Sequence, residues 1–302
     1  MSAQKIIANS KPLPERLDLR VDWAFKRIFG QKKHLQKIIK DLLDISIDVL
    51  EYDPNGLIVD TEQDKRSVFD VICKNKDTDE VFVLEMQNTY ESDMPDRLFY
   101  YGGSLIHNQV HVGDQVYVVK SVLVCCIASY YVPHNLPSPK GKVFFDYRMR
   151  ELETGEIFDG DKLRICFLEL NRFEHYLDKN SDLKEQWCWI FNNLCKFAER
   201  PSNLDSSFDD LIEDARIQKL TKVDRKDYMK ALEVSERDRK VIYEGGIIVG
   251  RHQGREEGRE EVKAEWLKEK QDAARAMKAD GVSIDQIQKY TGLTPEDIEA
   301  LD

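Results

Sequence analysis

Two short runs of β-branched and aromatic residues, separated by a polar stretch, form the clearest pattern in the first third of the chain. The first run covers residues 66–73 and the second covers residues 81–87, with mainly polar residues 74–80 between them. Runs of this composition joined by a short polar turn predict a β-hairpin. Because strand side chains alternate between two faces, Glu85 and Gln87 must point the same way, and the strand register decides whether Asp70 faces them.

Longer patterns predict the other elements of this region. Apolar residues spaced three and four apart predict helices around residues 22–30 and over residues 35–43, 94–111 and 183–199. Nearly continuous apolar runs predict buried strands over residues 116–128 and 162–170, and residues 135–142, which contain prolines and a glycine, predict a surface loop. A helix that connects neighbouring strands gives the crossover order of an α/β sheet. We therefore predict a first domain of residues 1–200, with an α/β core that ends near Pro201.

The charged segment 201–302 predicts a helical extension. Glycine recurs at every fourth position, at Gly246, Gly250, Gly254 and Gly258. Each glycine costs a helix interior about 1 kcal/mol, so the repeat favours close packing against a second helix over the alternative of a flexible hinge. Residues 251–280 contain eight basic and eight acidic side chains, a balance typical of an exposed helix that pairs with a second copy.

The end of the chain predicts two short helices with helix-turn-helix spacing. Ser283 and Gln286 have the spacing of a capping box for the first, and Thr294 with Pro295 starts the second after a break at Gly292. Residues 281–302 carry five acidic residues and one basic residue. A negative surface is unsuited to DNA, so we predict a packing or dimerisation unit rather than a DNA-reading one.

Asp70, Glu85 and Gln87 are the first candidates for chemistry. Two carboxylates and an amide around one point offer hard oxygen ligands, which suit Mg²⁺ or Mn²⁺ and leave room for water in reactions at phosphate. Charged residues near the end of a strand are also commonly no more than a solvated edge. The spacing alone leaves both interpretations open.

Motifs on either side of the hairpin distinguish these interpretations. Asp22-Trp23-Ala24-Phe25-Lys26-Arg27-Ile28-Phe29-Gly30 lies upstream, and Arg97-Leu98-Phe99-Tyr100-Tyr101 lies downstream. With the Asp70 strand and Glu85-Met86-Gln87 between them, the chain resembles the Rpn-type recombination-promoting nucleases, which are PD-(D/E)xK nuclease family transposases. The resemblance covers roughly residues 18–130. It implies a restriction-endonuclease-like core, a mixed sheet flanked by helices, and Mg²⁺-dependent cleavage of DNA.

The resemblance also implies roles for individual residues. Asp70 and Glu85 would hold Mg²⁺ or Mn²⁺, with the backbone carbonyl of Met86 as a further ligand. Gln87 stands where the wider superfamily has a lysine, and a neutral amide orients water by hydrogen bonds without supplying charge. The remaining candidates for the site are Asp22, Lys26 and Arg97, the last two as cations that stabilise charge on the phosphate.

These last residues also have ordinary structural interpretations. Asp22 and Lys26 stand four apart on one predicted helix, where an ion pair between them is the usual arrangement. Arg97 forms an i, i+3, i+4 set with Tyr100 and Tyr101, and tyrosines at this spacing commonly pack in a core. A functional and a structural interpretation therefore apply to each.

Net charge and cysteine content limit which binding partners and which cellular compartment the protein can have. The chain of 302 residues has a net charge of −11, yet residues 1–40 carry ten basic against three acidic residues, a local balance of +7. This region predicts phosphate contacts beside the proposed site, or alternatively a solubilising helical start. The six cysteines form no CxxC pair, which predicts reduced thiols without structural zinc. With no apolar stretch long enough for a membrane span or a signal peptide, we expect a soluble cytoplasmic protein.

These observations together predict a metal-dependent DNA endonuclease that acts in recombination, mobile-element activity or defence and forms homo-oligomers through its C-terminal helices. In this hypothesis Gln87 orients the water that attacks the phosphodiester. Two alternatives stay open. One is a DNA-binding or strand-synapsing protein whose site hydrolyses poorly, and the other is an oligomeric interaction protein that uses only its helical tail.

Overall fold

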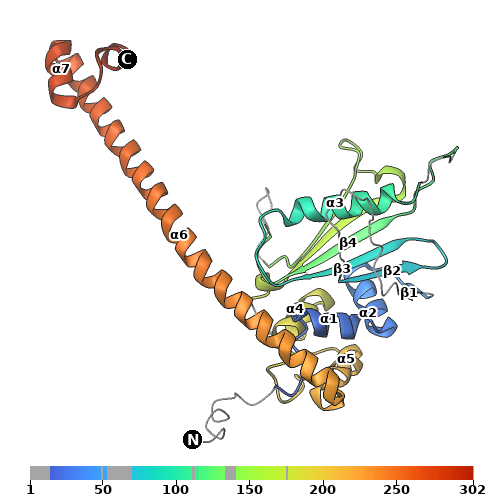
Figure 1. Ribbon diagram of the computed structural model, residues 1–302. Helices are drawn as coiled ribbons and strands as arrows, with labels where there is room; N and C mark the ends of the chain where they lie inside the picture. The colour runs from blue at the N-terminus through green and yellow to red at the C-terminus, as the bar shows by residue number, and fades with distance from the viewer. Residues whose placement is uncertain are drawn as a thin grey trace, which may run out of the picture. The chain divides into compact units, whose positions relative to one another are not determined.

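The computed structural model describes residues 14–48, 50–52, 70–110, 113, 115–132, 141–174 and 176–301, and for residues 52, 159 and 241–265 it describes the backbone alone. The chain divides into two compact units, Met1–Arg239 and Lys240–Asp302. The first unit contains the sheet and every residue of the predicted site (Figure 1).

Among the described residues, six strands form one mixed sheet in the order β1-β2-β3-β4-β6-β5 (Figure 1). The strands are β1 (Leu50–Tyr52), β2 (Val71–Asn75), β3 (Val81–Gln87), β4 (Val122–Ala128), β5 (Phe144–Arg148) and β6 (Leu163–Glu169). β3, β4 and β6 run parallel, while β1, β2 and β5 pair antiparallel with their neighbours. The predicted mixed α/β sheet and its hairpin are confirmed, although residues 66–69 of the first predicted strand lie outside the described residues.

Helices cover both faces of the sheet (Figure 1). Those on one face are α1 (Asp22–Phe29), α2 (Lys32–Leu43) and α4 (Leu183–Asn193). α3 (Met94–His107) lies on the other face, where Gly102 permits close packing because a Cβ atom there would clash with Leu163. Each helix matches a predicted one, although α3 ends before residue 111 and α4 ends before residue 199.

Successive side chains of β3 point alternately into the two layers of the core, one on each face of the sheet. Leu84 and Met86 join the buried cluster that contains α1 and α2, whereas Val83 joins the cluster beneath α3. Because successive strand residues point to opposite faces, Glu85 and Gln87 share the side of Val83. The two polar residues of the E-x-Q motif therefore lie on the α3 side of the sheet.

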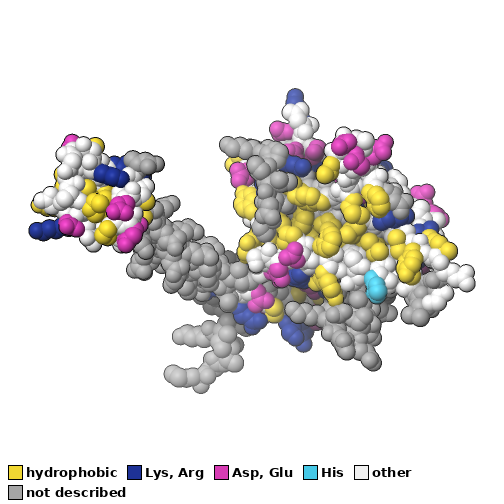
Figure 2. Space-filling model, turned by 90° about the horizontal axis from the view of Figure 1, so that it is seen from above, with side chains coloured by type: hydrophobic (Ala, Val, Ile, Leu, Met, Phe, Trp, Pro, Cys, Tyr) yellow, Lys and Arg dark blue, Asp and Glu magenta, His cyan; other side chains and the backbone are white. Residues whose placement is uncertain are grey.

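The α3 side of the first unit presents exposed apolar surface. Figure 2 views the molecule from above Figure 1 and shows hydrophobic side chains gathered over this side. Phe99 on α3 is 64% exposed and Tyr147 on β5 is 39% exposed. α3 therefore leaves part of this face accessible.

The sequence prediction omits β1 and β5 and starts β4 too early. β4 begins at Val122, and the apolar residues Val116, Tyr117 and Val118 before it are 70%, 85% and 64% exposed. Their composition predicted a strand, but no described residue buries them. The edge strand β5 has no counterpart in the prediction, because two of its five residues are charged and weaken the apolar signal.

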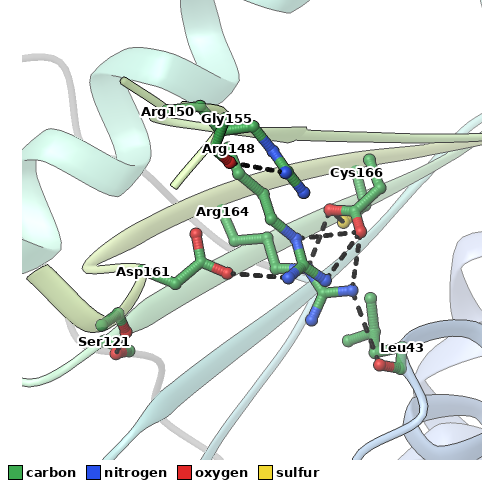
Figure 3. A network of polar contacts seen from close by, with 10 residues as sticks. Leu43, Ser121, Arg148, Arg150, Gly155, Asp161, Arg164 and Cys166 are labelled. Carbon is green, nitrogen blue, oxygen red and sulfur yellow. Dashed lines mark hydrogen bonds and ion pairs between the residues drawn. The ribbon is translucent and has the colours of Figure 1, made fainter. Parts of the chain in front are cut away.

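A network of arginines and aspartates fixes β5 to β6 (Figure 3). Arg164 of β6 donates two hydrogen bonds of 2.8 Å to Asp146 of β5, and Arg148 donates to the same carboxylate at 2.9 Å. Partial burial raises the pKa of Asp146, but the hydrogen bonds from Arg164 and Arg148 outweigh it and lower the pKa to about 2. The network lies at the start of β6, at the opposite end of the parallel strands from Gln87, and it holds the edge strand in place.

The packed core extends beyond Pro201, where the sequence pattern ended it. The chain continues through η4 (Ser206–Phe208), α5 (Asp209–Asp214), η5 (Ile217–Lys219) and the start of α6 (Lys222–Ala279). Leu204, Phe208 and Tyr228 are buried in the main core, and the Phe208 ring lies 4.9 Å from that of Trp187. The Tyr228 hydroxyl accepts a hydrogen bond of 2.9 Å from the backbone N–H of Asp18. Apolar residues are sparse in this segment, so the sequence pattern does not reveal that its helices help to form the core.

The helical prediction for the tail is confirmed. α6 runs for 58 residues as one helix, followed by α7 (Ile284–Thr291) and α8 (Pro295–Glu299). Ile287 and Ile298 form the small core of the second unit with the end of α6. No helix in the described part of the chain is long and apolar enough to cross a membrane.

The capping box predicted for α7 is found at α8 instead. Ser283 is the N-cap of α7, but its side chain makes no capping hydrogen bond, so the predicted capping box with Gln286 is wrong. α8 starts at Pro295 as predicted, and Thr294 forms a capping box with Asp297. The break at Gly292 is confirmed by its positive φ of 71°, which glycine adopts without strain.

Candidate active site

Asp70 and Glu85 face each other at one end of the hairpin. β2 and β3 pair with Val71 opposite Leu84, so one more step along the ladder places Asp70 opposite Glu85. The charge of Asp70 acts on the Glu85 carboxyl group across this pair. Asp70 Oδ2 also accepts a hydrogen bond of 2.8 Å from the backbone N–H of Met86. The register that the sequence left open is therefore the one that brings the carboxyl groups together.

Burial makes this carboxyl pair resist ionisation. Glu85 is 3% exposed, and its Oε1 makes no hydrogen bond to any described residue. Burial raises the pKa of Asp70 to about 6, with the neighbouring Asp22 adding to the rise. Burial first, and then the charge of Asp70, raise the pKa of Glu85 to about 9. Near neutral pH the pair holds a proton unless a cation replaces it.

Lys26 of α1 brings a positive charge to the pair. Its Nζ lies 2.7 Å from Asp22 Oδ1 and 3.3 Å from Asp70 Oδ1. The helical ion pair expected from the sequence is thus present, and the same ammonium also contacts the carboxyl pair. Partial burial acts to lower the pKa of Lys26, but Asp22 and Asp70 raise it above its ordinary value. Lys26 therefore stays charged, while Asp22 lies at the rim with its side chain 65% exposed.

Gln87 and Met86 complete the strand end. Gln87 is half-buried on the same face as Glu85, and its backbone carbonyl accepts a hydrogen bond of 2.9 Å from the N–H of Ser129, which directly follows β4. The Met86 side chain is buried in the core while its N–H holds Asp70. Its carbonyl, the further ligand expected from the sequence, lies between Glu85 and Gln87 along the chain.

Arg97 reaches the site from α3. Its guanidinium forms an ion pair with Glu91 and donates a hydrogen bond of 2.9 Å to the Tyr101 hydroxyl. The same guanidinium acts to lower the pKa of Glu85, against the burial that dominates. Tyr101 packs in the core, as tyrosines at this spacing commonly do, whereas Tyr100 is 44% exposed. The structure thus brings a second cation near the carboxyl pair.

The donor set fits a small divalent cation. Within the described ranges, no group of three or more His, Cys, Asp and Glu side chains is arranged to hold a metal ion. Mg²⁺ needs fewer protein ligands than that, since it keeps several waters and takes one or two carboxylates. Asp70 and Glu85 are the two carboxylates that could hold such an ion, and the buried Oε1 of Glu85 is an acceptor that the described protein groups leave unsatisfied.

Much of the positive charge near the N-terminus is paired with acidic residues. The pairs are Lys33 with Asp214, Lys37 with Asp41, and Arg27 with Asp224. Two of these acids come from α5 and α6, so a count over residues 1–40 could not include them. Lys32 and Lys40 are exposed on α2 and are the better candidates for phosphate contacts in this region.

Sequence reasoning missed two residues beside the site. Asn88 follows Gln87 and donates hydrogen bonds to the Arg20 carbonyl at 3.2 Å and to Ser235 Oγ of α6 at 3.3 Å. Glu91 holds Arg97. Both lie in the irregular segment between β3 and α3, where no periodic pattern exists. Their closeness to the E-x-Q motif was the only signal.

Comparison with known proteins agrees with this geometry. A family model described as PD-(D/E)XK nuclease family transposase matches residues 19–245, which is more than half of the chain. The resemblance seen in the four motifs is thereby confirmed, and the mixed sheet with helices on both faces is a restriction-endonuclease-like α/β fold. No curated protein and no solved structure matches the chain.

Proposed function

Since the chain belongs to the PD-(D/E)XK nuclease family transposases, we propose that it is a metal-dependent DNA endonuclease. The observation that carries the proposal is the strand register that places Asp70 opposite Glu85, with one buried Glu85 oxygen unpartnered among the described residues. Two adjacent buried acids are costly by themselves. A divalent cation bound between the two carboxylates would offset that cost.

The strand end provides the groups that hold the cation and the water. Asp70, Glu85 and the backbone carbonyl of Met86 would bind Mg²⁺ or Mn²⁺. When bound, the cation supplies positive charge to the phosphate and makes water a better nucleophile. The Met86 N–H fixes the Asp70 carboxylate at 2.8 Å. Gln87, on the same face as Glu85, orients the attacking water through its amide.

Two helices supply the charge that a lysine at position 87 would provide. Lys26 approaches Asp70 from α1, and Arg97 extends from α3. Fixed cations stabilise the negative charge that develops on the phosphate oxygens during attack. Asp22 holds the Lys26 ammonium at 2.7 Å and acts as a positioning residue.

Cleavage of supercoiled plasmid tests the proposal. The protein should nick or linearise the plasmid with Mg²⁺ or Mn²⁺ and leave it intact with EDTA. Asp70→Asn and Glu85→Gln should abolish cleavage. Asp77→Asn changes an exposed carboxylate on the turn of the same hairpin and should cleave at the wild-type rate. Thermal unfolding in EDTA shows that each variant is folded, and cleavage by Asp70→Asn at the wild-type rate would overturn the site assignment.

The two alternative functions predict different results in assays of DNA binding and DNA cleavage. A DNA-binding or synapsing protein would retain DNA in a gel without cutting it, and the neutral Gln87 is the feature that favours this outcome. An interaction protein that uses only its tail would show no DNA binding by residues 1–239. DNA cleavage by wild type and its loss in Glu85→Gln exclude both.

We further propose that the C-terminal helices join two copies of the chain. α6 is helical throughout the glycine repeat, so Gly246, Gly250, Gly254 and Gly258 lie along one side of it. Two copies would bring two sites to one duplex, which suits double-strand cleavage in recombination, mobile-element activity or defence. All six cysteines are free and five of them are buried, which fits the cytoplasm.

A further inference from the structure

Tyr130 carries a buried hydroxyl that the proposed mechanism does not use. The residue is 8% exposed, and its hydroxyl oxygen makes no hydrogen bond to any residue that the structure describes. A buried hydroxyl without a partner costs about 1–3 kcal/mol. A cost of this size needs a reason, and a ligand that accepts the hydrogen bond would provide one.

Tyr130 lies on the side of the sheet that carries the site. β4 runs parallel to β3, with Cys126 opposite Glu85 and Ala128 opposite Gln87. Tyr130 follows Ala128 by two positions and packs in the core beneath α3. Its side chain therefore shares the side of Glu85 and Gln87.

Tyr130 packs in the same buried cluster as Met94, the first residue of α3. Burial, above all, raises the pKa of Tyr130, while the nearby Arg97 acts to lower it and Asp93, the N-cap of α3, adds to the rise. The ring of Tyr90 meets the Tyr130 ring edge-on, with 5.4 Å between centroids. With its pKa raised, the phenol stays protonated and acts as a hydrogen-bond donor.

The Arg97 guanidinium, whose charge acts on this phenol, already holds an anion. Glu91 forms an ion pair with it, and the side chains of Arg97 and Glu91 are 32% and 34% exposed. A carboxylate on a guanidinium occupies the position that a phosphate takes in the same type of contact. Because both side chains are open to solvent on one side, an incoming phosphate can displace Glu91.

From these contacts we infer that Arg97 and Tyr130 form a subsite for a backbone phosphate of bound DNA adjacent to the cleaved one, which Glu91 occupies until DNA displaces it. The inference rests on the proposed nuclease function. Arg97 binds the phosphate oxygens with its fork of N–H groups, and Tyr130 donates the hydrogen bond that it lacks in the described protein.

The first turn of α3 adds to the attraction. A helix N-terminus carries partial positive charge and exposed N–H groups, and the Asp93 side chain makes no capping hydrogen bond there. Asp93 and Asp96 are exposed, so solvent and salt screen their charges more strongly than those of the groups beneath them. These two acids therefore oppose an anion at Arg97 and Tyr130 less than buried acids would.

Binding of a fluorescein-labelled DNA duplex in EDTA, measured by anisotropy, tests the subsite without cleavage. Tyr130→Phe removes only the hydroxyl and should weaken binding about five- to tenfold, with an unchanged salt dependence because no charge is lost. Arg97→Gln should weaken binding further and lower the slope of log Kd against log salt by about one. Tyr131→Phe is the matched control, since that hydroxyl is already bonded to the Asn171 carbonyl and Glu174.

Two further measurements separate recognition from folding. Thermal unfolding of Tyr130→Phe should be no lower than that of wild type, because the lost hydroxyl had no partner among the described residues. Glu91→Gln should tighten DNA binding severalfold, since the competing carboxylate is removed. Glu153→Gln makes the same charge change at an exposed position between β5 and β6 and should leave affinity unchanged.

The outcomes distinguish the subsite from the nuclease proposal. Wild-type affinity in Tyr130→Phe, or no tightening by Glu91→Gln beyond that of Glu153→Gln, would overturn the subsite while leaving metal-dependent cleavage intact. Absence of DNA binding by the wild-type protein would overturn the proposed function, and the subsite with it.

Discussion

Lys26 Nζ lies 3.3 Å from Asp70 Oδ1, so a lysine of the first helix reaches the carboxylate at the end of the hairpin. Asp22 holds the same ammonium at 2.7 Å. The strand itself offers only the neutral Gln87 at the position where related motifs carry a lysine. The site has a cation although its strand motif lacks one.

Substitutions that move the positive charge from position 26 to position 87 test whether Lys26 acts in place of the missing strand lysine. Lys26→Gln should slow single-turnover cleavage by about 100-fold, in the range found for loss of one group that stabilises a developing anion. Gln87→Lys alone should retain or raise activity, and in the Lys26→Gln background it should restore part of the loss. Lys76→Gln, at an exposed position on the turn of the hairpin and at the other end of β3 from Glu85, is the control. Full activity of Lys26→Gln would show that its ammonium has no part in cleavage.

The Asp70–Glu85 pair should make the metal-free protein less stable as the pH rises. The folded-state pKa values of about 6 and about 9 lie above those of carboxyl groups in an unfolded chain. Between about pH 5 and pH 9 the folded chain therefore holds protons that the unfolded chain has released. The free energy of unfolding should fall across this window, by about 1.4 kcal/mol per pH unit for each proton involved.

Glu85→Gln shows how much of this pH dependence of stability comes from the Asp70–Glu85 pair and how much from other groups. The amide keeps the shape of the side chain but has no titrating proton, so most of the slope should disappear. Urea unfolding in EDTA at pH 5, 7 and 9 measures it. An equal slope in wild type and Glu85→Gln would contradict the protonated pair.

Lys37 should prove to be a structural cation rather than a DNA contact. Its Nζ donates hydrogen bonds to Asp41 at 2.6 Å and to Ser207 at 2.7 Å, and it lies 4.2 Å from the centroid of the Phe208 ring. Lys37→Gln should lower the free energy of unfolding by about 1–2 kcal/mol because these partners lose the charge. Lys32→Gln, an exposed position on the same helix, should change it by less than about 0.5 kcal/mol. Urea unfolding decides, and equal stability of the two variants would exclude the structural role.

The proposed association through α6 predicts a monomer when bulk is added to the glycine repeat. Gly250→Leu combined with Gly254→Leu should disfavour association by holding two backbones apart, even though leucine raises helix propensity. Gln253→Leu, outside the repeat, is the control. Light scattering at micromolar concentration measures the effect, and a monomeric wild-type chain would rule the proposal out.

Truncation provides a second test of association. A chain that ends at Arg239 lacks the second unit and should also be monomeric. Truncation at Pro201 would instead remove Leu204, Phe208 and Tyr228 from the core and confound the result with unfolding. A dimer that survives truncation at Arg239 would place the interface in the first unit.

Much of the fold could be predicted because its signals are local. β3 begins and ends where its apolar run does, since alternate residues fill the two layers of the core. The exposed run at Val116–Val118 shows the limit of this approach, because composition does not reveal which segment the rest of the chain covers. The same limit hid β5 and the buried residues after Pro201.

The candidate site could be narrowed from the sequence but not assembled. The E-x-Q spacing placed Glu85 and Gln87 on one face, whereas the position of Asp70 depended on the hairpin register. Tyr130 gave no signal, and Asn88 and Glu91 gave only their closeness to the E-x-Q motif, because the neighbours of these residues lie on other strands and helices. The charge of the N-terminal region was misleading for the same reason, since distant acids neutralise part of it.

The segment that leads into α1 is fastened by residues near the end of the first unit. Leu17 N–H donates to the Ala215 carbonyl, and Asp18 N–H donates to the Tyr228 hydroxyl, each at 2.9 Å. A ribosome releases Lys26 long before it releases Tyr228, and a compact unit folds as a whole. The first helix therefore reaches its final position only late in synthesis. A nascent chain interrupted before that point would carry all four family motifs without Lys26 in its place beside Asp70.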